Sequence, residues 1–262
     1  MADAERKVVR TVPPRCRDAD RTLRYSPGMP YQEHPAFASQ PSDEARLWRY
    51  TDIAKLVVML QDSALWLCQL GQLEDAFEGA ITPEAMREYY GDIEPLDRRL
   101  HFVSQIVGAG RKYSYVSCWH ENEYESAAMW KIYGETGAVA VETTFGQLKR
   151  SLIGSERDLY IGRIEYLDYE TGFFELGNMF SPVLRKRRSF DFEREVRVVS
   201  AHMVDPVPSG LNVQVDLHEL VTAIWIAPQA QSFYEQAVRH VLERFELSVP
   251  VHYSSLADPP LV

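Results

Sequence analysis

Residues 190–199 read FDFEREVRVV, and this stretch determines how the rest of the chain is interpreted. Side chains alternate between the two faces of a strand, so a strand here places apolar residues such as Val196 on one face. Glu193, Glu195 and Arg197 then share the other face. We therefore predict a strand of an antiparallel sheet whose charged face is turned either toward water or toward a site.

Patterns typical of strands and helices alternate irregularly through the rest of the chain. Strands are predicted at 47–50, 64–68, 113–119, 137–145, 163–169, 192–199, 222–228 and 249–253. Helices are predicted at 52–61, from 83 onward, and at 95–107, 125–134 and 229–246. This irregular order favours an α+β fold of mixed, mainly antiparallel sheets with flanking helices over a regular doubly wound sheet.

The chain of 262 residues is predicted to consist of an N-terminal arm and one domain. Residues 1–46 hold six of the fifteen prolines and show no helical or alternating period, so we expect an extended arm. Residues 47–262 are expected to form a single α+β domain. The arm carries a net charge of +1, so of the total of −10 the domain carries −11. An acidic domain is a poor match for a long phosphate backbone.

Cysteine usage and hydropathy indicate a reducing, cytoplasmic setting. Cys16, Cys68 and Cys118 are odd in number and far apart, which predicts neither a disulfide framework nor a zinc site. No apolar run approaches the roughly 20 residues that cross a bilayer, and the N-terminus lacks the apolar core of a signal peptide. We expect a protein that is neither exported nor membrane-bound.

Several sequence blocks together resemble a large, mostly bacterial family catalogued as domain of unknown function 2971. The blocks are LWRYTD, LEDAFEG, VSCWHENEYESAAMWKIYGETGAVAVE and FEREVRVV, and they span roughly residues 47–200. The family commonly has an Asn-Asp-Pro-Phe-Glu loop and a Glu-Trp-Arg motif, and this chain matches each in part. The matching residues are Asp75, Glu78, Glu195 and Arg197.

A second resemblance concerns chemistry. Arg49, Ser117 and the pair Glu193 and Glu195 occur in the order of the Arg, Ser, Glu-x-Glu layout of arginine-type mono-ADP-ribosyltransferases. That resemblance implies an ADP-ribosyltransferase-like fold with NAD as the substrate. Cleavage of the bond between nicotinamide and ribose passes through an oxocarbenium-like state, which a carboxylate stabilises. Glu193 and Glu195 are the implied catalytic residues, and Glu195 would hold a ribose hydroxyl and face the developing charge.

The same resemblance implies a set of cofactor-binding residues. Arg49 would grip the NAD phosphates with its planar fork of donors, and Ser117 would orient the neighbouring strand. Tyr50 or Trp119 would stack on the nicotinamide ring, and Arg197 belongs to the same set. No metal is implied. If the chain has no NAD site, Arg49 would instead pair with a carboxylate such as Glu142, and the strand face that carries the Glu-x-Glu motif would be exposed to solvent.

Three other features have simpler interpretations. The residues HENEYE at 120–125 crowd a histidine and three glutamates, but their spacing fits a polar loop before a helix better than a metal site. The basic run RKRR at 185–188 would attract phosphates, yet such a run is more often a solvated face. Cys118 has no partner pattern of a nucleophile, and a buried structural cysteine is favoured.

Three functional hypotheses follow. The leading one is an NAD-using enzyme related to ADP-ribosyltransferases or NAD glycohydrolases, with a protein or nucleic-acid acceptor and a role as a bacterial toxin or phage-defence effector. The first alternative is a metal-dependent nucleotide or nucleic-acid processing enzyme that uses Asp75, Glu78 and the run at 185–188. The second is a non-catalytic module whose charged strand face binds a protein.

Overall fold

The structure is a computed structural model that describes residues 31–90, 96–133, 138–152 and 154–259. Its strands are β1 (Arg46–Asp52), β2 (Ala64–Gln69), β3 (Ser114–Glu121), β4 (Ala138–Thr144), β5 (Tyr160–Arg163), β6 (Glu165–Leu167), β7 (Arg185–Arg187), β8 (Glu195–Ala201), β9 (Gly210–Gln214), β10 (Ala223–Ile226) and β11 (Val251–Tyr253). Its α-helices are α1 (Ile53–Asp62), α2 (Pro83–Tyr90), α3 (Leu96–Tyr113), α4 (Ala127–Tyr133), α5 (Phe145–Ser151), α6 (Leu217–Leu220) and α7 (Phe233–Arg244). Short 3-10 helices include η1 (Pro35–Phe37) and η4 (Arg188–Glu193).

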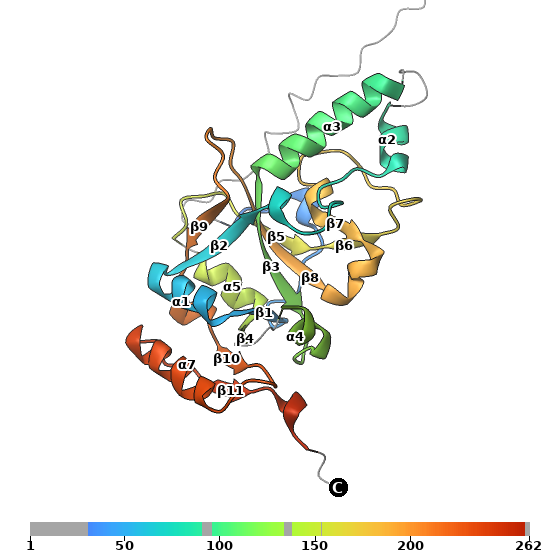
Figure 1. Cartoon of the computed structure of the whole chain (residues 1–262). Helices are drawn as coiled ribbons and strands as arrows, with labels where there is room; N and C mark the ends of the chain where they lie inside the picture. The colour runs from blue at the N-terminus through green and yellow to red at the C-terminus, as the bar shows by residue number, and fades with distance from the viewer. Residues whose placement is uncertain (1–30, 91–95, 134–137, 153, 260–262) are drawn as a thin grey trace, which may run out of the picture.

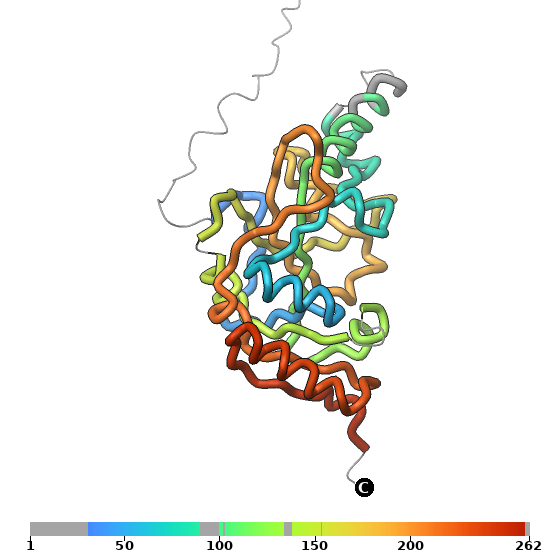
Figure 2. Tube along the Cα trace, turned by 60° about the vertical axis from the view of Figure 1, so that its left-hand side comes forward, coloured from blue at the N-terminus to red at the C-terminus, as the bar shows by residue number. Residues whose placement is uncertain are grey.

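Within these residues, nine strands form one mixed sheet, and β6 and β7 form a separate parallel pair. The order β11-β10-β4-β1-β3-β2-β9 is extended by β8, which pairs with β3 and β5. Every pairing in the large sheet is antiparallel except that of β10 with β11. Helices flank this sheet, with α3 at one end of the molecule and α7 at the other (Figures 1 and 2). The predicted α+β class is confirmed.

Local sequence explains several of the element boundaries. Asp52 caps α1 by accepting a hydrogen bond from the Lys55 backbone N–H at 2.8 Å, and Thr82 accepts one from Ala85 N–H at 3.2 Å at the start of α2. The predicted helix near the C-terminus is present as α7, and its buried residues are Val238 and Leu242. No described helix is long and apolar enough to span a membrane.

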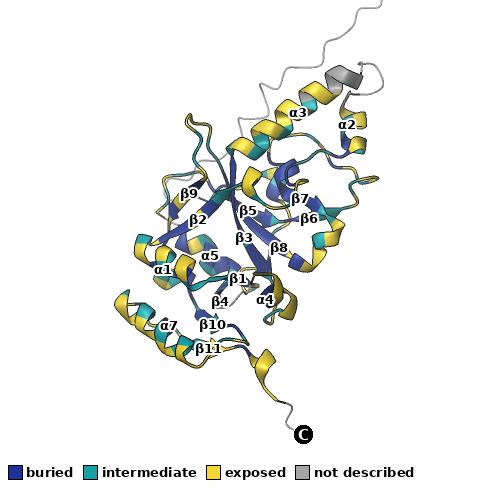
Figure 3. Ribbon diagram, viewed as in Figure 1, coloured by how far each residue is buried: buried dark blue, intermediate teal, exposed yellow. Residues whose placement is uncertain are grey.

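The start of β8 corrects the first prediction. Residues 188–193 form η4, and Arg194 takes a left-handed conformation with φ of 41°, so the strand begins only at Glu195. β8 lies between β3 and β5, and its residues from Glu195 to Ser200 are buried on both faces. Of the two predicted alternatives, a charged face turned toward water is therefore wrong: Arg197 is 0% exposed. Figure 3 shows β3 and β8 as the buried centre of the molecule.

The described part of the predicted arm packs on the domain. Phe37 in η1 is 1% exposed and stacks on Tyr160 of β5, with ring centroids 5.3 Å apart. It also meets Phe180 edge-on and leaves little space at Gly162 of β5. The described segment before β1 therefore contributes to the core, because a buried aromatic ring contributes a large apolar area.

β3 is the branch point of the large sheet (Figure 1). β8 runs along one edge of β3 from Ser114 to His120. On the other edge, β1 pairs only through Leu47 and Trp48 at one end, and β2 pairs only through Cys68 and Gln69 at the other end. β1 and β2 therefore leave the same edge of β3 at opposite ends. We call the gap between them the fork.

Candidate functional site

Arg49 of β1 occupies the fork. Its Nη1 donates a hydrogen bond to Ser117 Oγ of β3 at 2.5 Å, and its Nη2 donates one to the Trp66 carbonyl oxygen of β2 at 3.2 Å. The guanidinium also lies 5.8 Å from the centroid of the Trp119 ring. Arg49 of β1 thus contacts the other two strands that border the fork, β2 and β3. The structure brings together the predicted pair Arg49 and Ser117, although they are 68 residues apart in sequence.

Arg49 has no carboxylate partner among the residues that the structure describes. The expected alternative, Glu142, instead lies 3.7 Å from Arg46 and accepts a hydrogen bond from Trp225 Nε1 at 2.6 Å. Burial lowers the pKa of Arg49, which is the direction expected for a cation removed from water without a counter-charge. The pairing of Arg49 with Glu142 is therefore wrong, and the fork holds an uncompensated positive charge.

Neither aromatic residue proposed for stacking presents a free ring. Trp119 is 1% exposed, and its Nε1 is buried without a hydrogen-bond partner. Tyr50 packs edge-on against Trp130, with centroids 4.8 Å apart, and its hydroxyl accepts a hydrogen bond from the Ser126 backbone N–H at 2.8 Å. Trp66, which sequence reasoning missed, is the large aromatic residue exposed beside the fork, at 45%.

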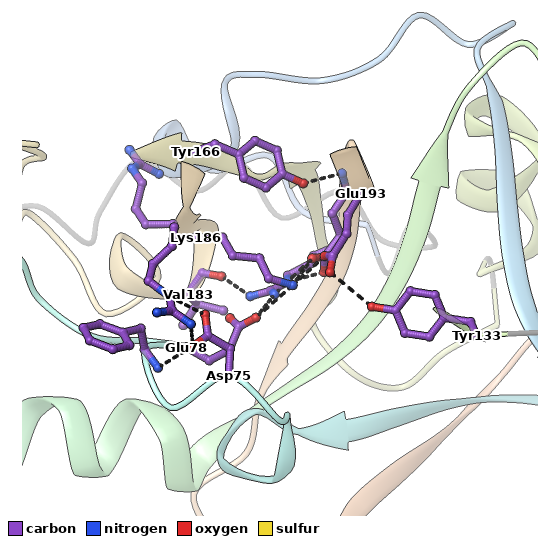
Figure 4. Close-up of polar contacts among 12 residues, drawn as sticks. Asp75, Glu78, Tyr133, Tyr166, Val183, Lys186 and Glu193 are labelled. Atoms are coloured by element: carbon purple, nitrogen blue, oxygen red, sulfur yellow. Dashed lines mark hydrogen bonds and ion pairs between the residues drawn. The ribbon is translucent and has the colours of Figure 1, made fainter. Parts of the chain in front are cut away.

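The glutamates of the Glu-x-Glu motif belong to a buried charge cluster formed by Glu78, Lys186, Glu193, Glu195 and Arg197 (Figure 4). Lys186 Nζ lies 2.5 Å from Glu193 Oε2, and 3.3 Å from both Glu195 Oε2 and Glu78 Oε1. Arg197 Nε donates to Glu195 Oε1 at 2.5 Å, and its Nη2 donates to Glu78 Oε1 at 2.8 Å. Three carboxylates thus share two cations, and each member is less than 9% exposed.

The two glutamates of the motif are in different electrostatic environments. Burial disfavours charge on Glu195, but Arg197 and Lys186 outweigh burial and lower its pKa to about 2. Burial is the dominant effect at Glu193, and it raises the pKa of that carboxyl despite the contact with Lys186. Glu195 is therefore the stable anion of the pair, whereas Glu193 takes up a proton more readily.

Glu193 is held by two elements besides β7. The Tyr133 hydroxyl of α4 donates to Glu193 Oε1 at 3.1 Å, and His120 Nδ1 lies 2.6 Å from the Glu193 carbonyl oxygen. Tyr133 is 44% exposed, so it connects the buried cluster with the surface. On the other side, the Tyr166 hydroxyl accepts a hydrogen bond from the Glu195 backbone N–H at 2.8 Å (Figure 4).

Cys118 links the fork with the charge cluster. Strand register places Ser117 opposite Val198 and Cys118 opposite Arg197, so Ser117 and the charge cluster lie on opposite faces of β3. Burial raises the pKa of the Cys118 thiol, and both Glu195 and Arg197 act on it. The Arg49 guanidinium also interacts with this thiol. The predicted residues are thus close in space but do not converge on one face.

The basic run at 185–188 is more structural than predicted. Lys186 is buried in the charge cluster, while Arg185 pairs with Glu165 at 2.9 Å and Arg187 pairs with Asp75 at 2.7 Å. The prediction of a solvated face is wrong for these three residues. Alternation in a short strand could have identified Lys186, because it points away from its two neighbours. Its buried partners could not be read from sequence, since they come from distant segments.

The HENEYE segment does not form a metal site in the described chain. Glu121 accepts two hydrogen bonds from Arg163, at 2.6 and 2.7 Å, and Glu125 accepts one from Trp130 Nε1 at 2.8 Å. Across the described residues, no group of three or more His, Cys, Asp or Glu side chains is placed to hold a metal ion. Glu78 and Asp75, which the metal-dependent hypothesis uses, are both paired with arginines.

No protein-family model matches the chain, and no curated protein matches it in sequence. Among solved structures, it is similar to Thermus sp. 2.9 DarT in complex with carba-NAD+, with 12% identity and a TM-score of 0.38 over 82% of this chain and 97% of that chain. A structure of the same protein in complex with ADP-ribosylated ssDNA gives 10% identity and a TM-score of 0.37 over 83% and 97%. The resemblance to domain of unknown function 2971 rests on sequence motifs alone.

Proposed function

We propose that this chain is an NAD-using enzyme of the ADP-ribosyltransferase type and a member of the domain of unknown function 2971 family. The reaction breaks the bond between the nicotinamide nitrogen and C1′ of the ribose, and the electron pair leaves with nicotinamide. An acceptor nucleophile, either water or a group on a protein or nucleic acid, forms the new bond to C1′ and loses a proton. A cytoplasmic effector, such as a toxin or a phage-defence protein, fits this chemistry.

The single observation that carries the proposal is the uncompensated Arg49 in the fork. A buried or half-buried guanidinium normally pairs with a carboxylate, because charge removed from water is costly without a partner. Within the described residues, the hydrogen-bond partners of Arg49 are neutral, namely Ser117 Oγ and the Trp66 carbonyl oxygen. Its remaining donor capacity suits an anion, and a planar guanidinium matches phosphate geometry. We assign Arg49 to the pyrophosphate of NAD.

The charge cluster supports the second half of the proposal. An oxocarbenium-like state needs a carboxylate that stays ionised, and the low pKa of Glu195 meets this need. We assign to Glu195 the stabilisation of the charge that develops on the ribose. Glu193, whose pKa is raised by burial, is assigned the proton transfer from the acceptor. Arg49 and Glu195 lie on opposite faces of β3, so the two assigned contacts would reach NAD from different sides of that strand.

The decisive experiment is nicotinamide release from NAD by the purified protein, with and without EDTA. The proposal predicts release that EDTA does not change, because no step uses a metal. Release that EDTA abolishes would favour the metal-dependent alternative. Binding of NAD without release would leave Arg49 with its role but remove Glu195 and Glu193 from catalysis. A protein that neither binds nor cleaves NAD would favour the non-catalytic module.

A further inference from the structure

His120 of β3 carries a buried hydrogen-bond acceptor that has no partner among the residues the structure describes. The imidazole is 3% exposed, and its Nδ1 lies 2.6 Å from the Glu193 carbonyl oxygen. A carbonyl oxygen can only accept, so Nδ1 must carry the proton and donate it. Burial lowers the pKa of His120 and favours the neutral ring. Nε2 is then a bare acceptor, and it is buried without any hydrogen-bond partner.

The position of this acceptor relates it to the proposed reaction. His120 and Glu195 are direct cross-strand partners in the pairing of β3 with β8. Side chains at such positions lie on the same face, with Cβ atoms about 4.5 to 5.5 Å apart. The ring of Tyr50 stands edge-on to the imidazole on the same face, with centroids 6.1 Å apart. The unpaired nitrogen therefore belongs to the surroundings of Glu195.

Glu195 itself has little accepting capacity to spare. Its Oε1 accepts from Arg197 Nε, and its Oε2 accepts from both Arg197 Nη2 and Lys186 Nζ. A ribose placed beside Glu195 brings hydroxyl groups that need acceptors. Buried polar atoms in proteins are normally paired, so an unpaired acceptor at this position calls for a donor that the described part of the chain does not supply.

We propose that His120 Nε2 accepts a hydrogen bond from a hydroxyl of the nicotinamide ribose of NAD. This inference rests on the proposed function, and it makes His120 a substrate-binding residue that holds the sugar against Glu195. The backbone contact with Glu193 fixes the imidazole in the tautomer that binding requires. Tyr133, which hydrogen-bonds to the same glutamate, is 44% exposed and connects this region with the surface.

Two variants separate the two ring nitrogens. His120→Asn keeps a side-chain N–H close to the position of Nδ1, so it can still donate to Glu193, but it has no acceptor at the position of Nε2. His120→Gln places an amide oxygen near the position of Nε2. Calorimetric titration with NAD should show affinity about tenfold weaker for His120→Asn, the size expected for one lost hydrogen bond. His120→Gln should retain most of the affinity, and thermal melts report whether each variant folds.

Analogues of NAD complete the test. Titrations use NAD lacking either the 2′- or the 3′-hydroxyl of the nicotinamide ribose. For the wild type, one of the two analogues should bind about tenfold more weakly than NAD. For His120→Asn, that analogue and NAD should bind equally well, because this variant already lacks the hydrogen bond that the analogue cannot make. Additive losses would overturn the role of His120 and leave the proposed function intact. A wild type that does not bind NAD at all would overturn both.

If neither variant folds, a crystal structure of the wild type with NAD decides. A ribose hydroxyl at about 3 Å from His120 Nε2 would support the inference. An ordered water bonded to Nε2 in that complex, with the ribose elsewhere, would overturn it, because the acceptor would then be satisfied by solvent alone.

Discussion

At the fork, Arg49 Nη1 of β1 donates a hydrogen bond to Ser117 Oγ of β3 at 2.5 Å. This contact holds a cation where two branches of the sheet leave the same edge of β3. A neutral hydroxyl orients the guanidinium without neutralising it. The charge thus remains available to a ligand, and substitution of Arg49 leaves no carboxylate unpaired in the described chain. That property makes Arg49 the most informative position for mutation.

Arg49→Lys is expected to weaken NAD binding by about 1.5 to 3 kcal/mol, the size of a hydrogen bond to a charged group. Lysine keeps the charge but lacks the planar guanidinium, whose paired N–H donors match the oxygens of a phosphate. The melting temperature should change little. The measurements are an NAD titration and a thermal melt on the same preparation.

The control for this prediction is Arg46→Lys on the same strand. Arg46 is half-exposed and lies 3.7 Å from Glu142, a surface pair of small energetic value. Its substitution should leave both NAD affinity and stability near the wild-type values. A strongly destabilised Arg49→Lys protein with normal affinity would show that Arg49 is structural.

Glu195→Gln is expected to lower the free energy of unfolding by about 3 to 5 kcal/mol, the cost of breaking a buried ion pair. Both carboxylate oxygens accept from cations, so an amide N–H₂ would face a donor in either orientation. Glu78→Gln should lower the free energy of unfolding by less than Glu195→Gln does. Glu78 Oε2 is buried without a partner, and the amide nitrogen can take that position while the oxygen still accepts from Arg197.

The same pair of variants tests catalysis. Nicotinamide release per folded molecule should be lost in Glu195→Gln, because the neutral amide cannot stabilise an oxocarbenium-like state. It should persist in Glu78→Gln. Urea unfolding gives the stabilities and the folded fractions used to normalise the rates. Equal activity of the two variants per folded molecule would remove Glu195 from the mechanism.

The fold was predictable where sequence patterns are local. Strand patterns and the Asp52 cap predict β1 and α1 closely, because alternation and capping act within a few residues. The start of β8 was not predictable in this way. Residues 190–193 alternate like a strand but belong to η4, which ends at Arg194 in a left-handed conformation. The carboxylate of Glu193 therefore contacts Lys186 from η4 and not from a strand.

The candidate site was predictable only in part for a related reason. Sequence order suggested Arg49 and Ser117 together, and tertiary structure brings them into contact. Whether Glu195 faces water depends on two distant segments. β5 pairs with the edge of β8 that β3 leaves free, and Lys186 of β7 contacts the Glu195 carboxylate. Because such burial comes from contacts between distant segments, a solvent-exposed charged strand and a buried charge cluster have the same local sequence pattern.

The stability of the protein is expected to decrease as the pH falls below about 6.5, in part because of His120. Burial lowers the pKa of this histidine from its ordinary value of 6.5. In the pH range between the two values, the unfolded chain binds a proton and the folded chain does not, so unfolding is favoured as the pH falls. The slope from one such group approaches about 1.4 kcal/mol per pH unit.

His120→Gln cannot bind this proton, so its stability should vary less between pH 7 and pH 5 than that of the wild type. Urea unfolding at several pH values measures the difference. The contributions of Glu193 and Glu195 are common to both proteins and cancel in the comparison. Parallel pH dependences would show that His120 has an ordinary pKa in the folded protein.

Phe37→Ala is expected to lower the free energy of unfolding by about 3 to 5 kcal/mol, the cost of deleting a fully buried aromatic ring. Phe37 is 1% exposed and packs on Tyr160 and Phe180, so its loss opens a cavity beside β5. Phe192→Ala is the matched control: Phe192 is 40% exposed, so its substitution should lower the free energy of unfolding far less. Urea unfolding of both variants measures the difference. Equal, small effects would mean that the segment before β1 does not belong to the core in solution.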